Sequence, residues 1–238
     1  NHYYEDGQDA WQYEKRILTE ETYTRVNAPY YRQTTDFTCG PASLMMAMKA
    51  QDSRQLMERS QELRIWKEAT TIFMTSGHGG CGPYGLALAA YHRGFSIELY
   101  VSERGVMFID SVRDPEKKEV MSLVQADFIR ELIKLPVAIH YNPLGVQELQ
   151  VHFEQGAIPI VLISSYRMYN EKAPHWVVVT GFDEKYIYVH DPYIDKEAGR
   201  SDVDSMNMPI AKKYFDRMAR YGKAGQKAAL IVKKTSGN

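Results

Sequence analysis

Cysteine is scarce in this sequence, and neither sign of charge is in excess. Only two of the 238 residues are cysteines, Cys39 and Cys81, and two isolated thiols exclude a disulfide-stapled scaffold. Lys and Arg total 29 against 30 Asp and Glu. This balance gives no electrostatic basis for binding nucleic acid or an anionic membrane surface. No apolar run approaches the ~20 residues that cross a bilayer, so we expect no membrane span in this chain.

The sequence also lacks the usual signs of a metal centre and of a signal peptide. It has no Cys-x-x-Cys pair, and a zinc site would have to combine His78-x-x-Cys81 with other histidines. The chain begins with Asn1 and not with Met, so we expect a matured protein or a piece of a longer one. No secretory segment is visible. We therefore expect a cytoplasmic location and no metal or organic cofactor.

Helical and strand-like patterns are segregated along the chain. Hydrophobic residues make up 44% and aromatic residues 12% of it, which is ample for a core. A polar arm, residues 1–28, precedes a single domain over 29–238. Apolar periodicity predicts helices at 39–50, 53–67, 83–92, 115–134, 145–154 and 207–221, and strands at 95–101, 136–140, 158–163, 176–180, 186–189 and 228–232. This order predicts an α+β fold, with a helical half facing an antiparallel sheet across a cleft.

Cys39 is the most informative residue. It lies within Asp36-Phe37-Thr38-Cys39-Gly40-Pro41-Ala42, at the start of a predicted helix, and Pro41 suits a first helical turn. A helix N-terminus carries partial positive charge, which favours thiolate over thiol. Gln33 lies six residues upstream, and its side-chain amide can donate to a developing oxyanion. Cys81 stands in a similar Cys-Gly-Pro triplet but has no such glutamine.

A base for this thiol is found in a predicted hairpin. His175 begins one strand, and Asp191 ends the other within His190-Asp191-Pro192. In an antiparallel pair the end of the second strand returns beside the start of the first. We therefore expect Asp191 to accept a hydrogen bond from His175. A nucleophile, a base and an orienting carboxylate are the parts of an acyl-transfer site.

Other histidines compete for the role of base. His190 is adjacent to Asp191, and His140 also closes a predicted strand. A lone histidine is more often a packed or solvated residue, and Asp-Pro is a common turn opener. The joint placement of His175 and Asp191 with a helix-capping cysteine favours that pair.

Taken in order, these segments resemble a known family. The run from Gln33 to Ala42, then His175-Trp176-Val177-Val178-Val179, then His190-Asp191-Pro192, is similar to the motifs of the bacteriocin-processing peptidases. These are papain-like cysteine peptidases that cut leader peptides after a double glycine. The resemblance covers residues 29–195. The chain is more similar to the stand-alone, peptidase-like relatives than to those fused to a membrane transporter.

The resemblance implies a papain-like fold and a role for each residue. By it, Cys39 is the nucleophile, His175 the base, Asp191 its orienting partner and Gln33 an oxyanion donor. The implied partner is a peptide or protein substrate, and the double-glycine specificity does not carry over to the stand-alone members.

Three further residues are expected beside the cleft. Trp176 follows His175, Tyr84 lies at the start of the third predicted helix, and Gly80 belongs to a glycine-rich loop over 76–82. Each also has a simpler interpretation. For either aromatic residue alone, core packing is the favoured interpretation, and the glycine suits a flexible loop beside the cleft.

Alternative functions remain open from the sequence. Residues 77–82, Gly-His-Gly-Gly-Cys-Gly, fit the dinucleotide-binding fingerprint, with Glu98 or Glu103 as the acidic residue about 20 positions on. The predicted hairpin argues against the alternating βα units of that fold. The same triad also serves a deamidase or an acyltransferase, and the same fold serves a module that binds peptides without cutting them.

Overall fold

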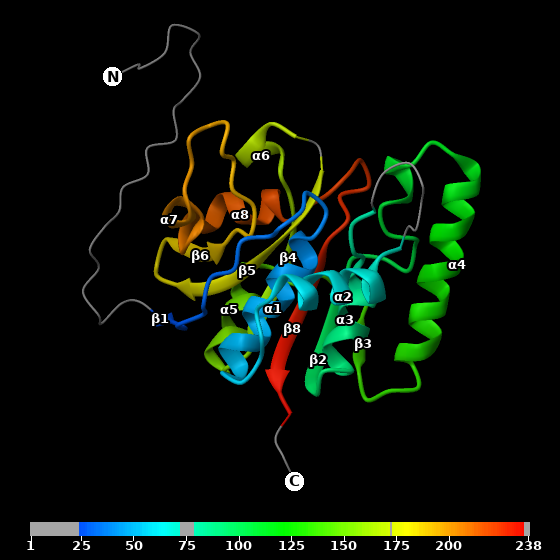
Figure 1. Ribbon diagram of the computed structural model, residues 1–238, viewed down its shortest axis with the longest axis horizontal. Helices are drawn as coiled ribbons and strands as arrows, with labels where there is room; N and C mark the ends of the chain where they lie inside the picture. Colours follow the sequence, from blue (N-terminus) through cyan, green and yellow to red (C-terminus); the bar gives the residue numbers. More distant parts are fainter. Residues whose placement is uncertain (1–23, 72–78, 172, 236–238) are drawn as a thin grey trace, which may run out of the picture.

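The computed structural model describes residues 24–71, 79–171 and 173–235, and it is built around one large sheet (Figure 1). The strands are β1 (Thr24–Arg25), β2 (Phe95–Val101), β3 (Ala138–His140), β4 (Ile158–Ser164), β5 (Pro174–Phe182), β6 (Tyr186–His190), β7 (Met208–Ala211) and β8 (Ala228–Lys234). They form an eight-stranded sheet in the order β3-β2-β8-β4-β5-β6-β7, and β1 pairs with β5. Only the β2–β3 pair among these described strands is parallel.

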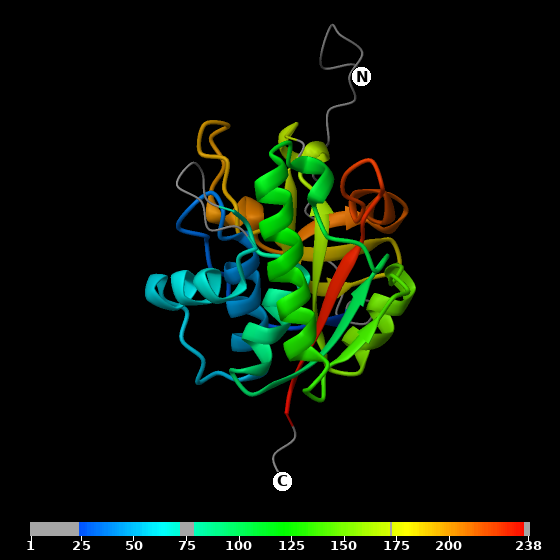
Figure 2. The same cartoon turned by 90° about the vertical axis from the view of Figure 1, so that its right-hand side faces the viewer.

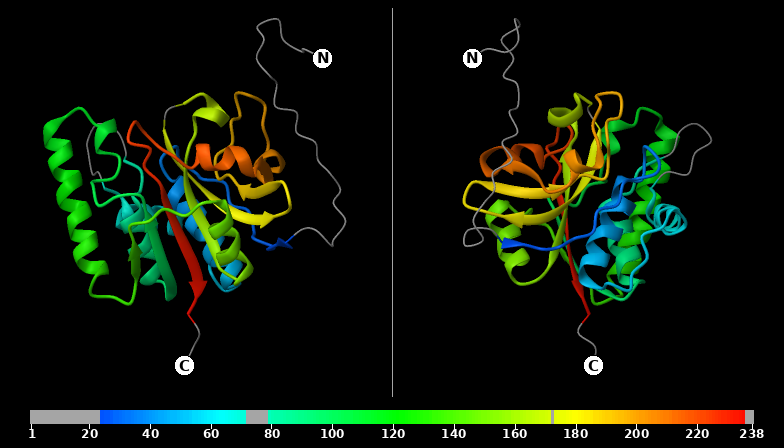
Figure 3. Two further views of the ribbon diagram at one scale, coloured as in Figure 1. Left: turned by 180° about the vertical axis from the view of Figure 1, so that it is seen from behind. Right: turned by 60° about the vertical axis from the view of Figure 1, so that its left-hand side comes forward.

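Helices cover both faces of this sheet. They are α1 (Cys39–Gln51), α2 (Arg59–Ala69), α3 (Pro83–Tyr91), α4 (Pro115–Leu132), α5 (Val146–Glu154), α6 (Tyr166–Tyr169), α7 (Asp202–Ser205) and α8 (Lys212–Met218), with a 3-10 turn at Ile109–Ser111. Helix α1 packs on β4, β5 and β8, and α3 packs on β2. Helix α5 packs on β4 from the opposite face (Figure 3). Helix α4 lies outside α3 (Figure 2).

The first helix is buried on all sides because it is enclosed by sheet and helices. Its residues from Cys39 to Met48 are all buried, as expected for a helix without a polar face. The hydroxyl of Ser43 donates to the carbonyl of Trp176 at 3.0 Å and so ties α1 to β5. This contact fixes the start of α1 relative to the strand that carries His175.

The predicted α+β fold is confirmed. Helices α1, α2 and α3 come early, as predicted, but α4 to α8 alternate with the later strands, so helices and strands are not segregated into two halves. The predicted hairpin is β5–β6, with Val178 opposite His190 and a bulge between Val179 and Gly181. Within the described residues, no helix combines the length and apolar character needed to span a membrane.

The helix predicted at 207–221 is wrong over its first part. Met208 pairs with Val189 of β6, and Met208 and Ile210 alternate with less buried neighbours in the period of a strand. Asn207 adopts a positive φ of 48° just before this strand. Pairing with β6 therefore overrides helical periodicity, and only Lys212–Met218 is helical.

The helix predicted from residue 53 begins later, at Arg59. The carboxylate of Asp52 accepts from the Arg54 backbone N–H at 3.1 Å, and the Asp52 carbonyl accepts from Gln55 N–H at 3.0 Å. An acidic residue that bonds the following backbone favours a turn over a helix. This turn separates α1 from α2.

The contact between α3 and α2 requires a glycine and gives a first prediction. A Cβ at Gly85 would lie 2.4 Å from the carbonyl oxygen of Ala69. We expect Gly85→Ala to lower the free energy of unfolding by about 1–3 kcal/mol, because rigid backbone must shift. Gly80, whose added Cβ meets nothing within 4 Å, is the control, and Gly80→Ala should change stability by less than about 0.5 kcal/mol. Urea unfolding measures both, and equal midpoints would contradict the packing described.

Candidate active site

Cys39 is the first residue of α1, so its thiol lies at the positive end of the helix. Its residue is 8% exposed, against 3% for Cys81. The first N–H groups of a helix have no partner within it. The backbone N–H of Cys39 is one of these groups. It is therefore free to donate a hydrogen bond to a negatively charged atom beside the Cys39 sulfur.

The β5–β6 hairpin brings His175 and Asp191 together. Nε2 of His175 lies 2.6 Å from Oδ1 of Asp191, and both residues are buried. Burial acts to lower the pKa of His175. The Asp191 carboxylate and the adjacent Cys39 thiol outweigh that effect and raise the pKa to about 10. The imidazole is therefore influenced by both groups. Its Nε2 is used by Asp191, which leaves Nδ1 for the sulfur.

The carboxylate of Asp191 is held by further donors. The hydroxyl of Tyr169 donates to Oδ2 at 2.6 Å, and the Tyr193 N–H donates to Oδ1 at 2.8 Å. The backbone of Asp191 is also fixed, since its carbonyl accepts from Tyr30 at 2.9 Å and its N–H donates to the Ser205 carbonyl at 2.9 Å. A fully buried carboxylate with this many donors is held in one orientation.

Tyr169 is a site residue that sequence reasoning missed. It belongs to the short helix α6, and burial followed by the charge of Asp191 raises its pKa. Its ring also meets the His175 ring edge-on at 6.3 Å between centroids. No sequence spacing links Tyr169 to Asp191, so their contact is visible only in the folded chain.

Gln33 lies beside the end of the same hairpin. Its backbone N–H donates to the carbonyl of Pro192 at 2.9 Å. Its Nε2 donates to the Thr35 carbonyl at 2.8 Å, and a primary amide has a second hydrogen to offer. Oε1 is buried and has no hydrogen-bond partner among the described residues. The backbone of Gln33 is thus held by the hairpin, whereas its side-chain amide still has one N–H hydrogen and one oxygen without a partner among the described residues.

The two cysteines differ more than their triplets suggest. Cys81 lies two residues before α3, whose N-cap is Gly82, whereas Cys39 is itself helical. Burial, followed by the proximity of Cys39, raises the pKa of the Cys81 thiol well above its ordinary value. Cys81 is accordingly a buried, protonated thiol.

The competing histidines have other partners. Nε2 of His190 lies 2.8 Å from the Ala28 carbonyl, and its Nδ1 accepts from the Asn207 N–H at 3.0 Å. Both ring nitrogens are therefore used in holding β6. His140 ends β3, near Glu98 at 3.7 Å and stacked on Tyr100 at 4.4 Å. Since β2, β8 and β4 separate β3 from β5, His140 is remote from His175.

The aromatic residues expected beside the cleft are in the core instead. Tyr84 is 1% and Trp176 is 2% exposed, and the Trp176 indole donates to the Cys81 carbonyl at 3.1 Å. Both side chains are almost completely buried, so neither offers an open surface to a substrate. Gly80 is exposed at the surface.

Dinucleotide and metal binding gain no support. The sheet is almost entirely antiparallel, which a dinucleotide-binding βαβ unit does not allow. Gly77 and His78 lie outside the described residues. Within the described ranges, no three His, Cys, Asp or Glu residues are grouped as metal ligands would be.

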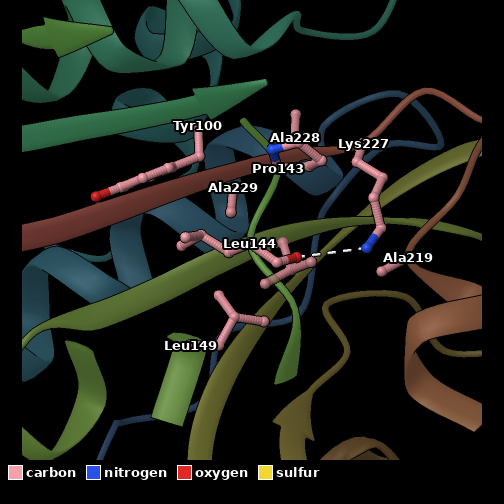
Figure 4. Close-up of a pocket in the computed structure, with 9 residues that line it drawn as sticks. Tyr100, Pro143, Leu144, Leu149, Ala219, Lys227, Ala228 and Ala229 are labelled. Carbon is pink, nitrogen blue, oxygen red and sulfur yellow. Dashed lines mark hydrogen bonds between the residues drawn. The ribbon is translucent and has the colours of Figure 1, made fainter. Parts of the chain in front are cut away.

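A small pocket near β2 and β8 is separate from these residues (Figure 4). It is lined by Tyr100, Pro143, Leu144, Leu149, Val161, Ala219, Lys227, Ala228 and Ala229. Its one charged group, Lys227, donates to the Leu144 carbonyl at 3.4 Å. None of Cys39, His175 or Asp191 lines it, so the chemistry above does not involve this pocket.

Several solved structures are similar to this chain over most of its length. A structure described as a C39-like peptidase from Bacillus anthracis has a TM-score of 0.51 at 13% identity, covering 91% of this chain and all (100%) of that one. A double glycine motif protease from an AMS/PCAT transporter, in complex with its leader peptide, has a TM-score of 0.45 at 16% identity, covering 89% and 94%. The peptidase domain of Streptococcus ComA, a bi-functional ABC transporter, has a TM-score of 0.42 at 13% identity, covering 86% and 98%.

A search of curated proteins finds no match to the chain. The first of the structural likenesses shows a shared fold. A family model, described as the Peptidase_C39 like family, matches residues 28–233. This match takes in both strands of the β5–β6 hairpin, the helix that begins at Cys39 and nearly all of β8. The chain therefore belongs to the Peptidase_C39 like family.

Proposed function

We propose that this protein is a cysteine peptidase, a thiol hydrolase that cleaves a peptide or amide bond in a peptide or protein substrate. The observation that carries the proposal is the buried 2.6 Å contact between His175 and Asp191, with Cys39 beside the same imidazole. Membership of a peptidase-like family supports it. No cofactor is needed for this chemistry.

In this proposal His175 carries a proton at neutral pH, because its pKa is raised to about 10. The imidazolium stabilises the Cys39 thiolate, which attacks the substrate carbonyl and breaks its π bond. The proton of His175 then passes to the leaving amine as the C–N bond breaks. The neutral imidazole next takes a proton from water, whose oxygen attacks the thioester, and Cys39 leaves as thiolate.

Two donors stabilise the oxyanion formed in each attack. They are the second Nε2 hydrogen of Gln33 and the backbone N–H of Cys39. One such donor is typically worth about 2.7–4 kcal/mol of transition-state stabilisation. The Tyr169 hydroxyl does not touch the reacting atoms, and it acts by holding Asp191.

The same residues also suit deamidation, acyl transfer to an amine, or peptide binding without cleavage. The product mass separates these reactions. Hydrolysis gives two shorter chains, deamidation adds about 1 Da, and acyl transfer gives a new amide.

A peptide library provides the most direct test of hydrolysis. We expect the wild-type protein to convert part of a proteome-derived library into shorter peptides, and Cys39→Ala to lose this activity by at least ~10³-fold. Cys81→Ala is the matched control and should retain it. Mass spectrometry of the products gives the answer. Cleavage that persists in Cys39→Ala would contradict the proposal.

Thiol reactivity gives a test that needs no substrate. We expect iodoacetamide at pH 6 to alkylate Cys39 at least about tenfold faster than Cys81, because the buried Cys81 stays protonated. His175→Ala should slow the labelling of Cys39, since the stabilising cation is lost. Peptide mapping of timed samples measures both rates. Equal and slow labelling of the two cysteines would reject Cys39 as nucleophile.

The raised pKa of His175 predicts a pH dependence. Its folded pKa of about 10 lies above the ordinary value of 6.5. The stabilisation from the charged pair is therefore complete below pH 6.5 and lost as the pH rises through 10. We expect Asp191→Asn to lower the imidazole midpoint by about 1–3 units. NMR titration of the His175 ring protons measures it, and an unchanged midpoint would disprove the assigned cause.

A further inference from the structure

Glu62 is a buried carboxylate that takes no part in the chemistry described above. It lies in α2 and is 0% exposed. Burying a carboxylate is costly unless strong donors compensate. The residues that donate hydrogen bonds to Glu62 therefore indicate its role.

In the part of the chain that the structure describes, the Glu62 carboxylate accepts four hydrogen bonds, each from a neutral donor in residues 31–38. Oε1 accepts from the Thr34 N–H at 2.8 Å and from the Thr38 hydroxyl at 2.5 Å. Oε2 accepts from the Thr34 hydroxyl at 2.7 Å and from the Tyr31 hydroxyl at 3.0 Å. One carboxylate thus fastens the segment that leads into α1 at three of its residues.

Two of these anchored residues flank the proposed oxyanion donors. Thr34 follows Gln33, and Thr38 precedes Cys39. The side-chain amide of Gln33 and the backbone N–H of Cys39 are therefore each one residue from an anchored position. Because Thr34 and Thr38 both bond Oε1, the carboxylate sets the distance between the two ends of the segment.

Helix α2, which carries Glu62, is itself held against α3. The backbone of Ala69, on the same helix, is in close contact with Gly85. The anchor is thus part of the rigid helical layer. A misplacement of about 1 Å in a catalytic group is enough to cost about 10²-fold in rate.

We propose that Glu62 is a positioning residue that holds the two oxyanion donors in register. The inference rests on the proposed function, because it assigns a role to a residue outside the triad of that same site. It predicts that loss of the Glu62 carboxylate slows those reactions of Cys39 that form an oxyanion and leaves the rates of its other reactions unchanged.

Two reactions of Cys39 separate these cases. Acetylation by p-nitrophenyl acetate passes through a tetrahedral oxyanion, whereas alkylation by iodoacetamide displaces iodide at a saturated carbon and forms none. In Glu62→Gln we expect the acetylation rate to fall about 10–100-fold. The alkylation rate should stay within about twofold. Both rates are measured at Cys39 by peptide mapping.

Glu68→Gln is the matched control, because it removes a carboxylate from the same helix that does not touch residues 31–38. It should leave both rates unchanged. Thr38→Val removes one donor to Oε1 and should also lower the acetylation rate while sparing the alkylation rate. This variant provides the test if Glu62→Gln does not fold. Glu62→Asp, with its shorter reach, should fall between the wild type and Glu62→Gln.

The outcomes distinguish this inference from the proposed function. If wild-type Cys39 is neither acetylated nor alkylated faster than Cys81, the proposed function fails and the inference with it. If wild-type Cys39 is acetylated and Glu62→Gln matches it within about twofold, the inference alone is overturned. An equal fall of both rates also overturns the inference, because Glu62 would then support the structure in general and not the oxyanion donors in particular.

Discussion

The hydrogen bond between the imidazole of His175 and the carboxylate of Asp191 depends on the whole sheet. Its two residues lie at the adjacent ends of β5 and β6, and the 2.6 Å separation requires that hairpin to keep its register. Asp191 is further held by residues far apart in the sequence: Tyr30, Tyr169 and Ser205. A buried hydrogen-bonded pair of this kind persists only where its neighbours are in place, so this contact reports on the integrity of the fold.

The proposed nucleophile, Cys39, lies on a helix that packs against the sheet. Helix α1 lies across β4, β5 and β8, and the Ser43 contact to the Trp176 carbonyl sets its start relative to His175. The segment before α1 is fixed twice, by Gln33 N–H on the Pro192 carbonyl and by Glu62. Acyl transfer requires a thiol, a base and oxyanion donors close together. The residues proposed for these roles are brought together by the contact between helices and sheet.

Local chemistry made much of the site predictable from sequence. A helix-capping cysteine and a hairpin with His175 and Asp191 at its open end follow from periodicity and strand geometry. Glu62 and Tyr169 could not be found this way, because their partners lie 24 to 31 and 22 residues away without a repeating pattern. Contacts between distant segments also determine β7, which forms only because it pairs with β6. They likewise place β8, the last strand in the sequence, in the middle of the sheet.

The central claim is that Cys39 is a nucleophile activated by the His175–Asp191 pair. Mass mapping after brief exposure to p-nitrophenyl acetate tests it most directly, because a thioester is cleaved by neutral hydroxylamine and a lysine amide is not. We predict a hydroxylamine-sensitive acetyl group on Cys39, formed more slowly in both His175→Ala and Asp191→Asn. Acetylation confined to lysines or to Cys81, or a Cys39 thioester formed equally fast in His175→Ala, would contradict the account.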